Sequence, residues 1–297
     1  TSRILITKKC WKHALAMESL TNKSRTVLVT GTSSGIGRGL CHALIKRGYK
    51  VFGTVRNRKD ATELKKEFGE NLDALLVDVT DEKQVIKAKE RVQNYLNGKP
   101  LTALINNAGI ATLGPVEFLP TSDFKKQIDT KILGTFLCTK IFLPLLGTDN
   151  NLIGNPGRIV NISSILGGKI GSPFMSGYCA SKHAVEAFSE SLRRELKPYG
   201  IKVIIVAPGS VSTPIWKEVK KQKDQNKYHK TKYGISFKKI LNSLESFDQN
   251  SLSMNQLTSI IIKSIEIKNP KIRYNPTKDP IQKLWPYIPK KIMDSFF

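Results

Sequence analysis

Short apolar segments alternate with amphipathic segments from about residue 26 onward, and this alternation constrains the fold more than any other feature of the chain. The apolar segments are rich in β-branched residues and end at glycine or polar residues, which is typical of buried strands. The amphipathic segments have apolar residues at helical spacing, and several end at glycine. We predict strands at residues 26–31, 49–56, 72–80, 101–109, 157–164 and 202–209, and helices at residues 36–48, 61–69, 82–98, 122–146 and around Tyr178. Short connections between strand and helix favour parallel βαβ units. We therefore expect a single α/β domain of the Rossmann type, a doubly wound parallel sheet with helices on both faces.

The ends of the predicted strands are polar or rich in glycine. In sequence order they read TGTSSGIG, TVRNR, DVTD, NNAG, ISS and APGSVST. Binding sites in open parallel sheets lie at the carboxyl ends of the strands. The site is therefore expected along this edge.

The first strand end places Gly31, Gly35 and Gly37 between a strand and a helix. Glycines at this position allow a tight turn and let the backbone approach a pyrophosphate, which the helix N-terminus stabilises. Three glycines in a turn are weak evidence alone, but their place at the start of a βαβ unit favours a dinucleotide site.

The segment SGYCASKHAVEAF places Tyr178 four residues before Lys182. Residues four apart share one face of a helix, so the two side chains are expected to lie beside each other. Taken alone, this spacing is equally typical of two solvated side chains on a surface helix. Only the other motifs can indicate whether Tyr178 and Lys182 form a catalytic pair.

Together the motifs resemble the short-chain dehydrogenase/reductase family. TGTSSGIG resembles its cofactor loop, NNAG its fourth-strand motif, YCASK its Tyr-x-x-x-Lys pair and PGSVST its PG motif, while Ser164 stands at the place of its catalytic serine. The resemblance covers about residues 26–215, with the motifs in order and at normal spacing.

This resemblance implies hydride transfer between a nicotinamide cofactor and an alcohol or carbonyl. It implies Tyr178 as general acid or base, Lys182 on the nicotinamide ribose and Ser164 on the substrate oxygen. An ammonium near a phenol favours the phenolate, so Lys182 is expected to lower the pKa of Tyr178 from about 10 toward neutrality. Ser163 is the alternative for the serine role, although the family uses the second serine of such a doublet.

One position departs from the family pattern. The family has asparagine in N-x-x-G of the fourth helix, where it supports a water in the proton relay, whereas DTKILGTF places Lys131 there. Lys131 is expected in the catalytic group. It either adds positive charge beside Lys182 and lowers the pKa of Tyr178 further, or turns outward.

The resemblance also places cofactor contacts along the strand ends. The expected residues are Gly31, Ser33, Ser34, Gly35, Ile36, Gly37, Arg56, Asp78, Val79, Asn107, Ala108, Gly109, Tyr178, Lys182, Pro208, Gly209, Val211 and Thr213. Among the roles it implies, Asp78 contacts adenine, Asn106 lies near the adenosine ribose and Thr213 contacts the nicotinamide carboxamide.

The end of the second strand decides between the two nicotinamide cofactors. An acidic residue there binds the ribose hydroxyls in NAD-binding proteins, but here Val55 occupies the place and Arg56, Arg58 and Lys59 follow. A guanidinium pairs bidentately with a phosphate that an acid would repel. We expect NADP(H) rather than NAD(H), with Arg56 at the 2′-phosphate. The alternative is that these cations belong to a generally lysine-rich surface.

Substrate contacts are expected after the PG motif. Residues 212–250 are interpreted as a helical lid, with a solvated face as the alternative, and residues 275–297 as a mixed aromatic and basic segment that lines the pocket, packs at a subunit interface or touches a membrane surface. A looser resemblance to hydroxysteroid, retinol and 3-hydroxybutyrate dehydrogenases implies a lipophilic or medium-sized alcohol or ketone. The family resemblance implies a homodimer or homotetramer.

Composition bounds the remaining classes. The net charge of +24 suggests nucleic acid or an anionic surface, but it is spread along the chain without a nucleic-acid-binding motif, so no specific nucleic-acid partner is expected. The sequence contains no run of about 18 apolar residues, so no membrane span is predicted.

The four cysteines lack metal-ligand spacing, so no metal is expected, and they indicate a reducing, cytoplasmic compartment. Residues 1–25 form a basic N-terminal extension for which organelle targeting is an alternative. A non-catalytic dinucleotide-binding sensor is the alternative to an enzyme.

Overall fold

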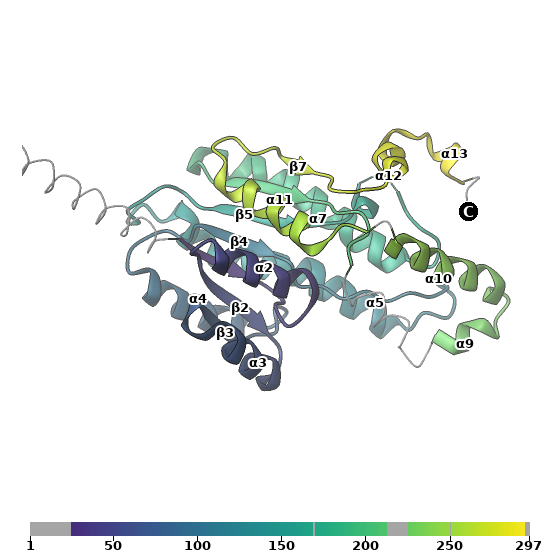
Figure 1. Ribbon diagram of the computed structural model, residues 1–297, viewed down its shortest axis with the longest axis horizontal. Coiled ribbons are helices and arrows are strands. Elements are labelled where there is room, and N and C mark those ends of the chain that lie inside the picture. Colours follow the sequence, from purple (N-terminus) through teal and green to yellow (C-terminus); the bar gives the residue numbers. More distant parts are fainter. Residues whose placement is uncertain (1–24, 169, 213–224, 250, 295–297) are drawn as a thin grey trace, which may run out of the picture.

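The computed structural model describes residues 25–168, 170–212, 225–249 and 251–294. Its centre is a sheet of seven parallel strands in the order β3-β2-β1-β4-β5-β6-β7 (Figure 1). The strands are β1 (Thr26–Val29), β2 (Lys50–Val55), β3 (Leu72–Leu76), β4 (Ala103–Asn106), β5 (Arg158–Ile162), β6 (Lys202–Val206) and β7 (Arg273–Tyr274). The order reverses between β1 and β4, so the sheet is doubly wound and the predicted Rossmann-type α/β fold is confirmed.

Helices cover both faces of the sheet. The helices of the described chain are α2 (Gly35–Lys46), α3 (Arg58–Phe68), α4 (Glu82–Leu96), α5 (Thr121–Ile128), α6 (Gly134–Leu143), α7 (Ser176–Glu195), α9 (Gln225–His229), α10 (Gly234–Gln249), α11 (Met254–Glu266), α12 (Pro280–Leu284) and α13 (Lys290–Asp294). Short 3₁₀ turns lie at Gly69–Asn71, Ile165–Gly167, Lys197–Tyr199 and Trp285–Tyr287, and π-helical turns at Asp129–Leu133 and Pro144–Thr148.

Two apolar clusters hold the layers together. One contains buried side chains of α2, α3 and α11 against one face of the sheet, and the other contains side chains of α4, α6 and α7 against the opposite face. Burial of apolar area of this kind supplies most of the favourable free energy of folding. The sheet and its helices therefore form a rigid frame on which the strand ends are fixed.

The strands β3 and β4 are shorter than predicted, and the helix predicted at residues 122–146 is interrupted by the π-helical turn Asp129–Leu133. Helix α3, strand β7 and helix α11 also differ from the sequence prediction. Helix α3 begins at Arg58, three residues before the predicted start, because the Asn57 side chain caps it by accepting a hydrogen bond from the backbone of Asp60 (2.9 Å). The strand β7 and the helix α11 were not expected. Strand β7 has only two residues and is defined by its pairing with β6, and α11 begins with a capping box between Ser253 and Gln256.

The continuous helical run Thr121–Thr148 is long and apolar enough to cross a membrane. Half of its most apolar stretch is buried inside the protein, and its two α-helical parts pack against α4, β4 and α7. A buried helix of a core passes the same test, so this run is weak evidence for a membrane span.

The helices α9, α10, α12 and α13 gather at one end of the molecule (Figure 1). This end lies beyond the carboxyl ends of the strands, since Tyr228 of α9 and Gln282 of α12 approach Gly114 and Gly209, which follow β4 and β6. The predicted lid is thus helical where it is described, and residues 213–224 within it lie outside the described residues.

Candidate active site

The glycine loop after β1 is shaped by close backbone approaches. Gly31 has a φ of +70°, and a Cβ atom there would lie 2.9 Å from the Cα atom of Ala108. A Cβ atom on Gly37 would lie 2.0 Å from the main-chain oxygen of Gly31. Neither position tolerates a side chain, so the loop can press its backbone against the start of α2.

The start of α2 presents unpaired donors. Ser34 caps the helix without a side-chain hydrogen bond, and in the described part of the chain nothing accepts from the N–H groups of Gly35, Ile36 and Gly37. Such N–H groups, together with the positive end of the helix dipole, bind phosphate. The predicted loop residues Ser33 to Gly37 therefore form a cradle suited to a pyrophosphate.

Residues after β4 hold the glycine loop in place. The side-chain amide of Asn107 donates to the main-chain oxygens of Thr30 and Gly31 (2.9 Å each). The backbone N–H groups of Asn107 and Ala108 donate to the hydroxyl of Thr30 (3.0 and 2.9 Å). The NNAG segment therefore fixes the conformation of the glycine loop through hydrogen bonds to Thr30 and Gly31.

Asn106 lies elsewhere than the resemblance implied. Its side chain is buried and donates to Asn161 (2.8 Å) and Thr139 (3.2 Å) in the interior between the sheet and its helices. An amide engaged in this way does not reach an adenosine ribose. Successive side chains of a strand alternate between faces, so Asn106 and Asn107 point in different directions.

The end of β2 carries exposed cations. Arg56 follows the buried Val55 and is exposed, and no acidic side chain of the described residues pairs with it. Arg38, in contrast, is engaged with the main-chain oxygen of Ser33 (3.3 Å) and with Glu67. Arg56, directly at the end of β2, is therefore available to an anion, as is the exposed Arg58 that begins α3.

The end of β3 is organised around Asp78. Its carboxylate accepts hydrogen bonds from the backbone and the hydroxyl of Thr80 (2.9 and 2.7 Å). Val79 is buried and packs beside Gly134, where a Cβ atom would come within 2.5 Å of it. The loop after β3 therefore has a fixed conformation.

Helix α7 brings Tyr178 and Lys182 to the same place. Both side chains are buried, and the Lys182 Nζ atom lies 5.5 Å from the centre of the Tyr178 ring. The Tyr178 side chain is hydrogen-bonded to Ser164. The structure thus assembles the expected group of Ser164, Tyr178 and Lys182 from the segment after β5 and from α7.

The neighbouring serine has a different partner. The Ser163 hydroxyl donates to Glu186 (2.8 Å), and Glu186 accepts two hydrogen bonds from Arg273 of β7 (2.8 and 2.9 Å). Ser163 therefore belongs to a supporting network rather than to the group around Tyr178. Sequence analysis missed this network because Glu186 and Arg273 are 87 residues apart and carry no motif.

The expected direction of the Tyr178 pKa is wrong. Burial raises the pKa of Tyr178 to about 12, and its hydrogen bond with Ser164 only partly opposes this rise. Burial also holds the pKa of Lys182 well below 10.5, helped by the neighbouring Lys131. Lys182 therefore does not draw the pKa of Tyr178 toward neutrality, because desolvation outweighs the pairing expected from the sequence.

Lys131 turns inward, which decides between the two alternatives. It lies in the π-helical turn Asp129–Leu133, is buried, and donates to the main-chain oxygens of Asn107 (3.3 Å) and Ala108 (3.1 Å). Its amino group also neighbours that of Lys182. Burial lowers the pKa of Lys131 to about 8.

The loop after β6 is covered by the C-terminal segment. The main-chain oxygen of Pro208 accepts from Ile165 (3.0 Å), and the backbone of Gly209 donates to Pro276 (2.9 Å). A Cβ atom on Gly209 would lie 2.3 Å from the side-chain oxygen of Gln282. Val211 is buried and bridges to Leu252, whereas Thr213 lies outside the described residues.

An apolar cluster surrounds the Tyr178 side chain. Its buried members are Ala111, Leu113, Met175, Tyr178, Cys179, Tyr228 and Phe237. Phe174, in the unusual left-handed conformation (φ 61°), stacks edge to face on Phe237 with ring centres 5.4 Å apart. This cluster joins α7 to α9 and α10 and makes the surroundings of the hydroxyl apolar.

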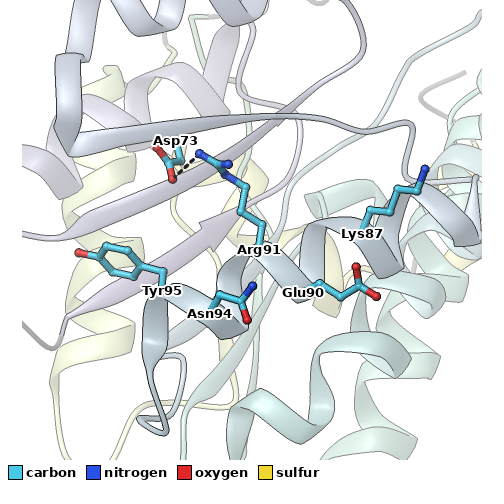
Figure 2. A pocket seen from close by; sticks show the side chains of 6 residues that line it. All are labelled: Asp73, Lys87, Glu90, Arg91, Asn94 and Tyr95. Carbon is cyan, nitrogen blue, oxygen red and sulfur yellow. Dashed lines mark hydrogen bonds and ion pairs between the residues drawn. The ribbon is translucent and has the colours of Figure 1, made fainter.

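A hollow of about 480 Å³ lies away from this site, between α4 and β3 (Figure 2). It is lined by Asp73, Lys87, Glu90, Arg91, Asn94 and Tyr95, and Arg91 bonds to Asp73 (3.4 Å). Asp73 is the second residue of β3, so the hollow lies toward the amino end of that strand. None of its lining residues belongs to the group around Tyr178, so this hollow is not part of the candidate active site.

No group of three His, Cys, Asp or Glu side chains in the described ranges has the arrangement of a metal site. Cys41, Cys138 and Cys179 are buried free thiols, and burial raises the pKa of each. These cysteines pack as small apolar side chains.

The fold, the glycine loop and the Ser164–Tyr178–Lys182 group define a nucleotide-binding oxidoreductase of the Rossmann type. Residues 25–224 match the short chain dehydrogenase family, and the chain belongs to that family.

Its relatives include the NADPH-dependent 3-dehydrocapnine reductase of Ornithobacterium rhinotracheale, 32% identical over 92% of this chain and 96% of that protein. Retinol dehydrogenase 16 of Mus musculus is 32% identical over 92% of this chain and 86% of that protein. The closed form of serine dehydrogenase complexed with NADP⁺ superimposes with a TM-score of 0.70 at 25% identity, over 84% of this chain and 94% of that one.

Proposed function

We propose that the protein is an NADP(H)-dependent reductase that converts a lipophilic ketone or aldehyde to the alcohol, with Tyr178 as the general acid. The observation that carries this proposal is the buried Tyr178 hydroxyl, bonded to Ser164, whose pKa is raised to about 12. A phenol with this pKa stays protonated at neutral pH. It is therefore ready to give a proton to a carbonyl oxygen, and less ready to take one from an alcohol.

The residues present fit a nicotinamide dinucleotide. The unpaired N–H groups at the start of α2 and the close-packed glycine loop suit a pyrophosphate. The adjoining loops supply Asp78, Val79, Asn107, Ala108, Gly109, Pro208, Gly209 and Val211 around the same cradle, and Thr213 remains a proposed contact. When bound there, the cofactor supplies the hydride.

The preference for NADP(H) over NAD(H) rests on Arg56. It is exposed at the end of β2, without an acidic partner in the described chain and with no acid at Val55 to repel a phosphate. The relative described as an NADPH-dependent reductase and the serine dehydrogenase complexed with NADP⁺ support this preference.

The residues around Tyr178 divide the chemical work. Ser164 donates to the substrate oxygen and holds it beside the phenol, and the Tyr178 Oη atom gives up its proton as that oxygen becomes negative. The apolar cluster with Tyr228 and Phe237 excludes water, which strengthens both hydrogen bonds.

The same cluster supports a lipophilic substrate. Its walls are aromatic and aliphatic side chains, and α10 packs on it through Phe237, which is fully buried. One relative is named for retinol, a lipophilic alcohol.

We also propose a homodimer or homotetramer in the cytoplasm. Phe124, Leu133 and Phe136 of the α5–α6 run are exposed apolar side chains, which suits a contact between subunits. Light scattering of the purified protein measures the assembly.

The direct test is oxidation of NADPH by purified protein with a panel of lipophilic ketones and aldehydes. We expect NADPH to be consumed and the Tyr178→Phe variant to lose the activity by about 10²-fold or more. The alternative is a non-catalytic dinucleotide sensor, for which Lys131 in the place of the family asparagine is the favouring feature. Binding of NADPH without consumption across the panel would support that sensor.

A further inference from the structure

Lys182 and Glu186 lie four residues apart on α7, so both side chains project from the same face of the helix. At this spacing a lysine and an acid commonly form an ion pair. Lys125 and Asp129, at the end of α5, do so with the lysine first, as it is on α7. An ion pair between Lys182 and Glu186 is therefore the arrangement that the helix itself favours.

The structure shows a different arrangement. The Lys182 amino group donates to the main-chain oxygens of Ile162 (3.0 Å) and Ser163 (3.0 Å) at the end of β5. It lies 5.5 Å from the centre of the Tyr178 ring. Among the described residues no ion pair joins it to Glu186, so the amino group is held by the strand end and beside the phenol.

The Glu186 carboxylate is occupied by other donors. Arg273 of β7 binds it with two hydrogen bonds, from Nε to Oε2 (2.8 Å) and from Nη2 to Oε1 (2.9 Å). The Ser163 hydroxyl donates to Oε1 as well (2.8 Å). A guanidinium that binds a carboxylate through both oxygens forms a strong and directional ion pair. The side chains of Glu186 and Arg273 are only 14% and 24% exposed, so water screens this ion pair weakly.

Strand β7 holds Arg273 in this position. Arg273 lies opposite Ile205 of β6 in the parallel pairing, and the backbone of Ile205 donates to the main-chain oxygen of Ile272 (2.9 Å). The remaining nitrogen of the guanidinium, Nη1, contacts the side chain of Asn275. All three nitrogens of Arg273 are thus engaged, and a strand of two residues brings one guanidinium to the helix that carries Tyr178.

The turn Ile165–Gly167 closes over Glu186 and Lys182 together. A Cβ atom on Gly167 would lie 3.0 Å from the Oε1 atom of Glu186 and 3.1 Å from the Cβ atom of Lys182. The two side chains therefore lie against the same point of the turn. Burial holds the pKa of Lys182 well below 10.5, and the charge of Glu186 opposes this shift, as expected for a carboxylate close to the amino group.

We propose that Arg273 is a positioning residue for the active site: it occupies the Glu186 carboxylate, prevents Glu186 from pairing with Lys182, and so leaves the Lys182 amino group at the end of β5 beside Tyr178. A carboxylate in a poorly hydrated place attracts any cation within reach. Without Arg273, that cation is Lys182, one helical turn away.

The catalytic consequence rests on the proposed reductase function. If Lys182 turned to Glu186, its amino group would leave the end of β5 and the neighbourhood of Tyr178. A displacement of about 1 Å in a catalytic group can cost about 10²-fold in rate. Arg273 would thereby act on the reaction through Glu186 and Lys182, without contact with substrate or cofactor.

The position of Lys182 is tested without turnover, by the crystal structure of Arg273→Met. We expect the Lys182 Nζ atom within about 4 Å of a Glu186 carboxylate oxygen, and its hydrogen bonds to Ile162 and Ser163 lost. Lys182 still bound to both main-chain oxygens would overturn the proposal. Arg273→Gln, which keeps N–H donors but not the charge, is the second variant in case Arg273→Met fails to fold, and the same movement of Lys182 is expected.

Kinetics distinguish positioning from simple support of β7. Arg273→Met should lower kcat/KM for ketone reduction by about 10-fold to 100-fold. Adding Glu186→Gln to it should restore kcat/KM to within about threefold of the parent, because the carboxylate that attracts Lys182 is gone. If Arg273 only supported β7, the double variant would be as slow as Arg273→Met or slower, and that result would refute the proposal.

Two further variants complete the comparison. Arg273→Lys keeps the charge without the two-pronged geometry and should fall between the parent and Arg273→Met. Arg194→Met removes an exposed arginine that pairs with Glu190 on the same helix, and this matched control should leave kcat/KM unchanged. A parent protein that reduces no ketone or aldehyde would refute the proposed reductase, while the crystal structure of Arg273→Met still decides the role of Arg273.

Discussion

The side-chain amide of Asn107 donates to the main-chain oxygen of Gly31 at 2.9 Å, and with a second bond to Thr30 it ties the end of β4 to the glycine loop. A Cβ atom on Gly37 would lie 2.8 Å from the Asn107 amide nitrogen, so the amide also fills the space beside the first turn of α2. One side chain thus sets the path of the loop that the cofactor would contact.

Asn107→Ala removes both of these donors. We expect the free energy of unfolding to fall by about 1–3 kcal/mol, because two partly buried carbonyl groups lose their partner. Affinity for NADPH should fall by about tenfold as the loop loses its fixed path. Chemical denaturation and quenching of protein fluorescence by NADPH measure the two effects. Asn94→Ala, on the exposed side of α4, is the control, and an unchanged affinity for NADPH in Asn107→Ala would contradict the assigned role.

The two serines after β5 should separate in their effects. Ser164→Ala removes the hydroxyl that contacts Tyr178, and we expect kcat/KM to fall by about 10²-fold or more. Ser163→Ala removes a hydrogen bond to Glu186, and we expect a loss of about 1 kcal/mol in stability with activity within a few-fold of the parent. Steady-state kinetics and chemical denaturation of both variants test these expectations. A large loss of kcat/KM in Ser163→Ala with little loss in Ser164→Ala would assign the catalytic role to Ser163 instead.

Arg56 should control the choice of cofactor. Arg56→Ala removes the exposed guanidinium at the end of β2, and we expect the preference of kcat/KM for NADPH over NADH to fall by about 10-fold to 100-fold. Arg58→Ala, in the first turn of α3, is the matched control and should have a smaller effect. The ratio is measured with both cofactors at one fixed ketone concentration, and equal effects of the two variants would make the preference a property of the general surface charge.

The buried Lys131 predicts a pH dependence of stability. Its pKa in the folded protein is about 8, below the 10.5 of the unfolded chain, so the folded state binds fewer protons between these values. The free energy of unfolding therefore rises with pH across this window, by up to about 1.4 kcal/mol per pH unit, while below pH 8 the full cost of the buried charge is present. Chemical denaturation of the parent and of Lys131→Met at several pH values should show a steeper rise in the parent. Parallel curves would mean that Lys131 keeps its ordinary pKa.

Much of the fold follows from sequence periodicity. The strands β1 to β6 and the helices between them were predicted in the right order and within a few residues of their observed bounds, because each apolar run ends at a residue that stops it. The helix α11 and the strand β7 escaped prediction for different reasons. The pairing of β7 with β6 depends on a contact far along the chain, and the buried apolar face of α11 packs against α2 rather than forming part of a motif.

The sequence predicted which residues form the site better than it predicted their pKa values. The motif positions predicted that Ser164, Tyr178 and Lys182 would meet. The sequence could not show that Lys131 turns inward, because a π-helical turn and the carbonyl groups of Asn107 and Ala108 decide its direction. The pKa of Tyr178 was predicted in the wrong direction, since a spacing of four residues reports a neighbouring charge and says nothing of burial.

Transfer of hydride is the central claim, and deuterium makes it visible. NADPH that carries deuterium at its transferable position is mixed with excess protein and a lipophilic ketone, and the alcohol is analysed by mass spectrometry. The predicted result is an alcohol one mass unit heavier with the parent protein, and none over the same time with Tyr178→Phe. Bound NADPH that transfers no deuterium to any ketone or aldehyde of a broad panel would contradict the assignment of a reductase.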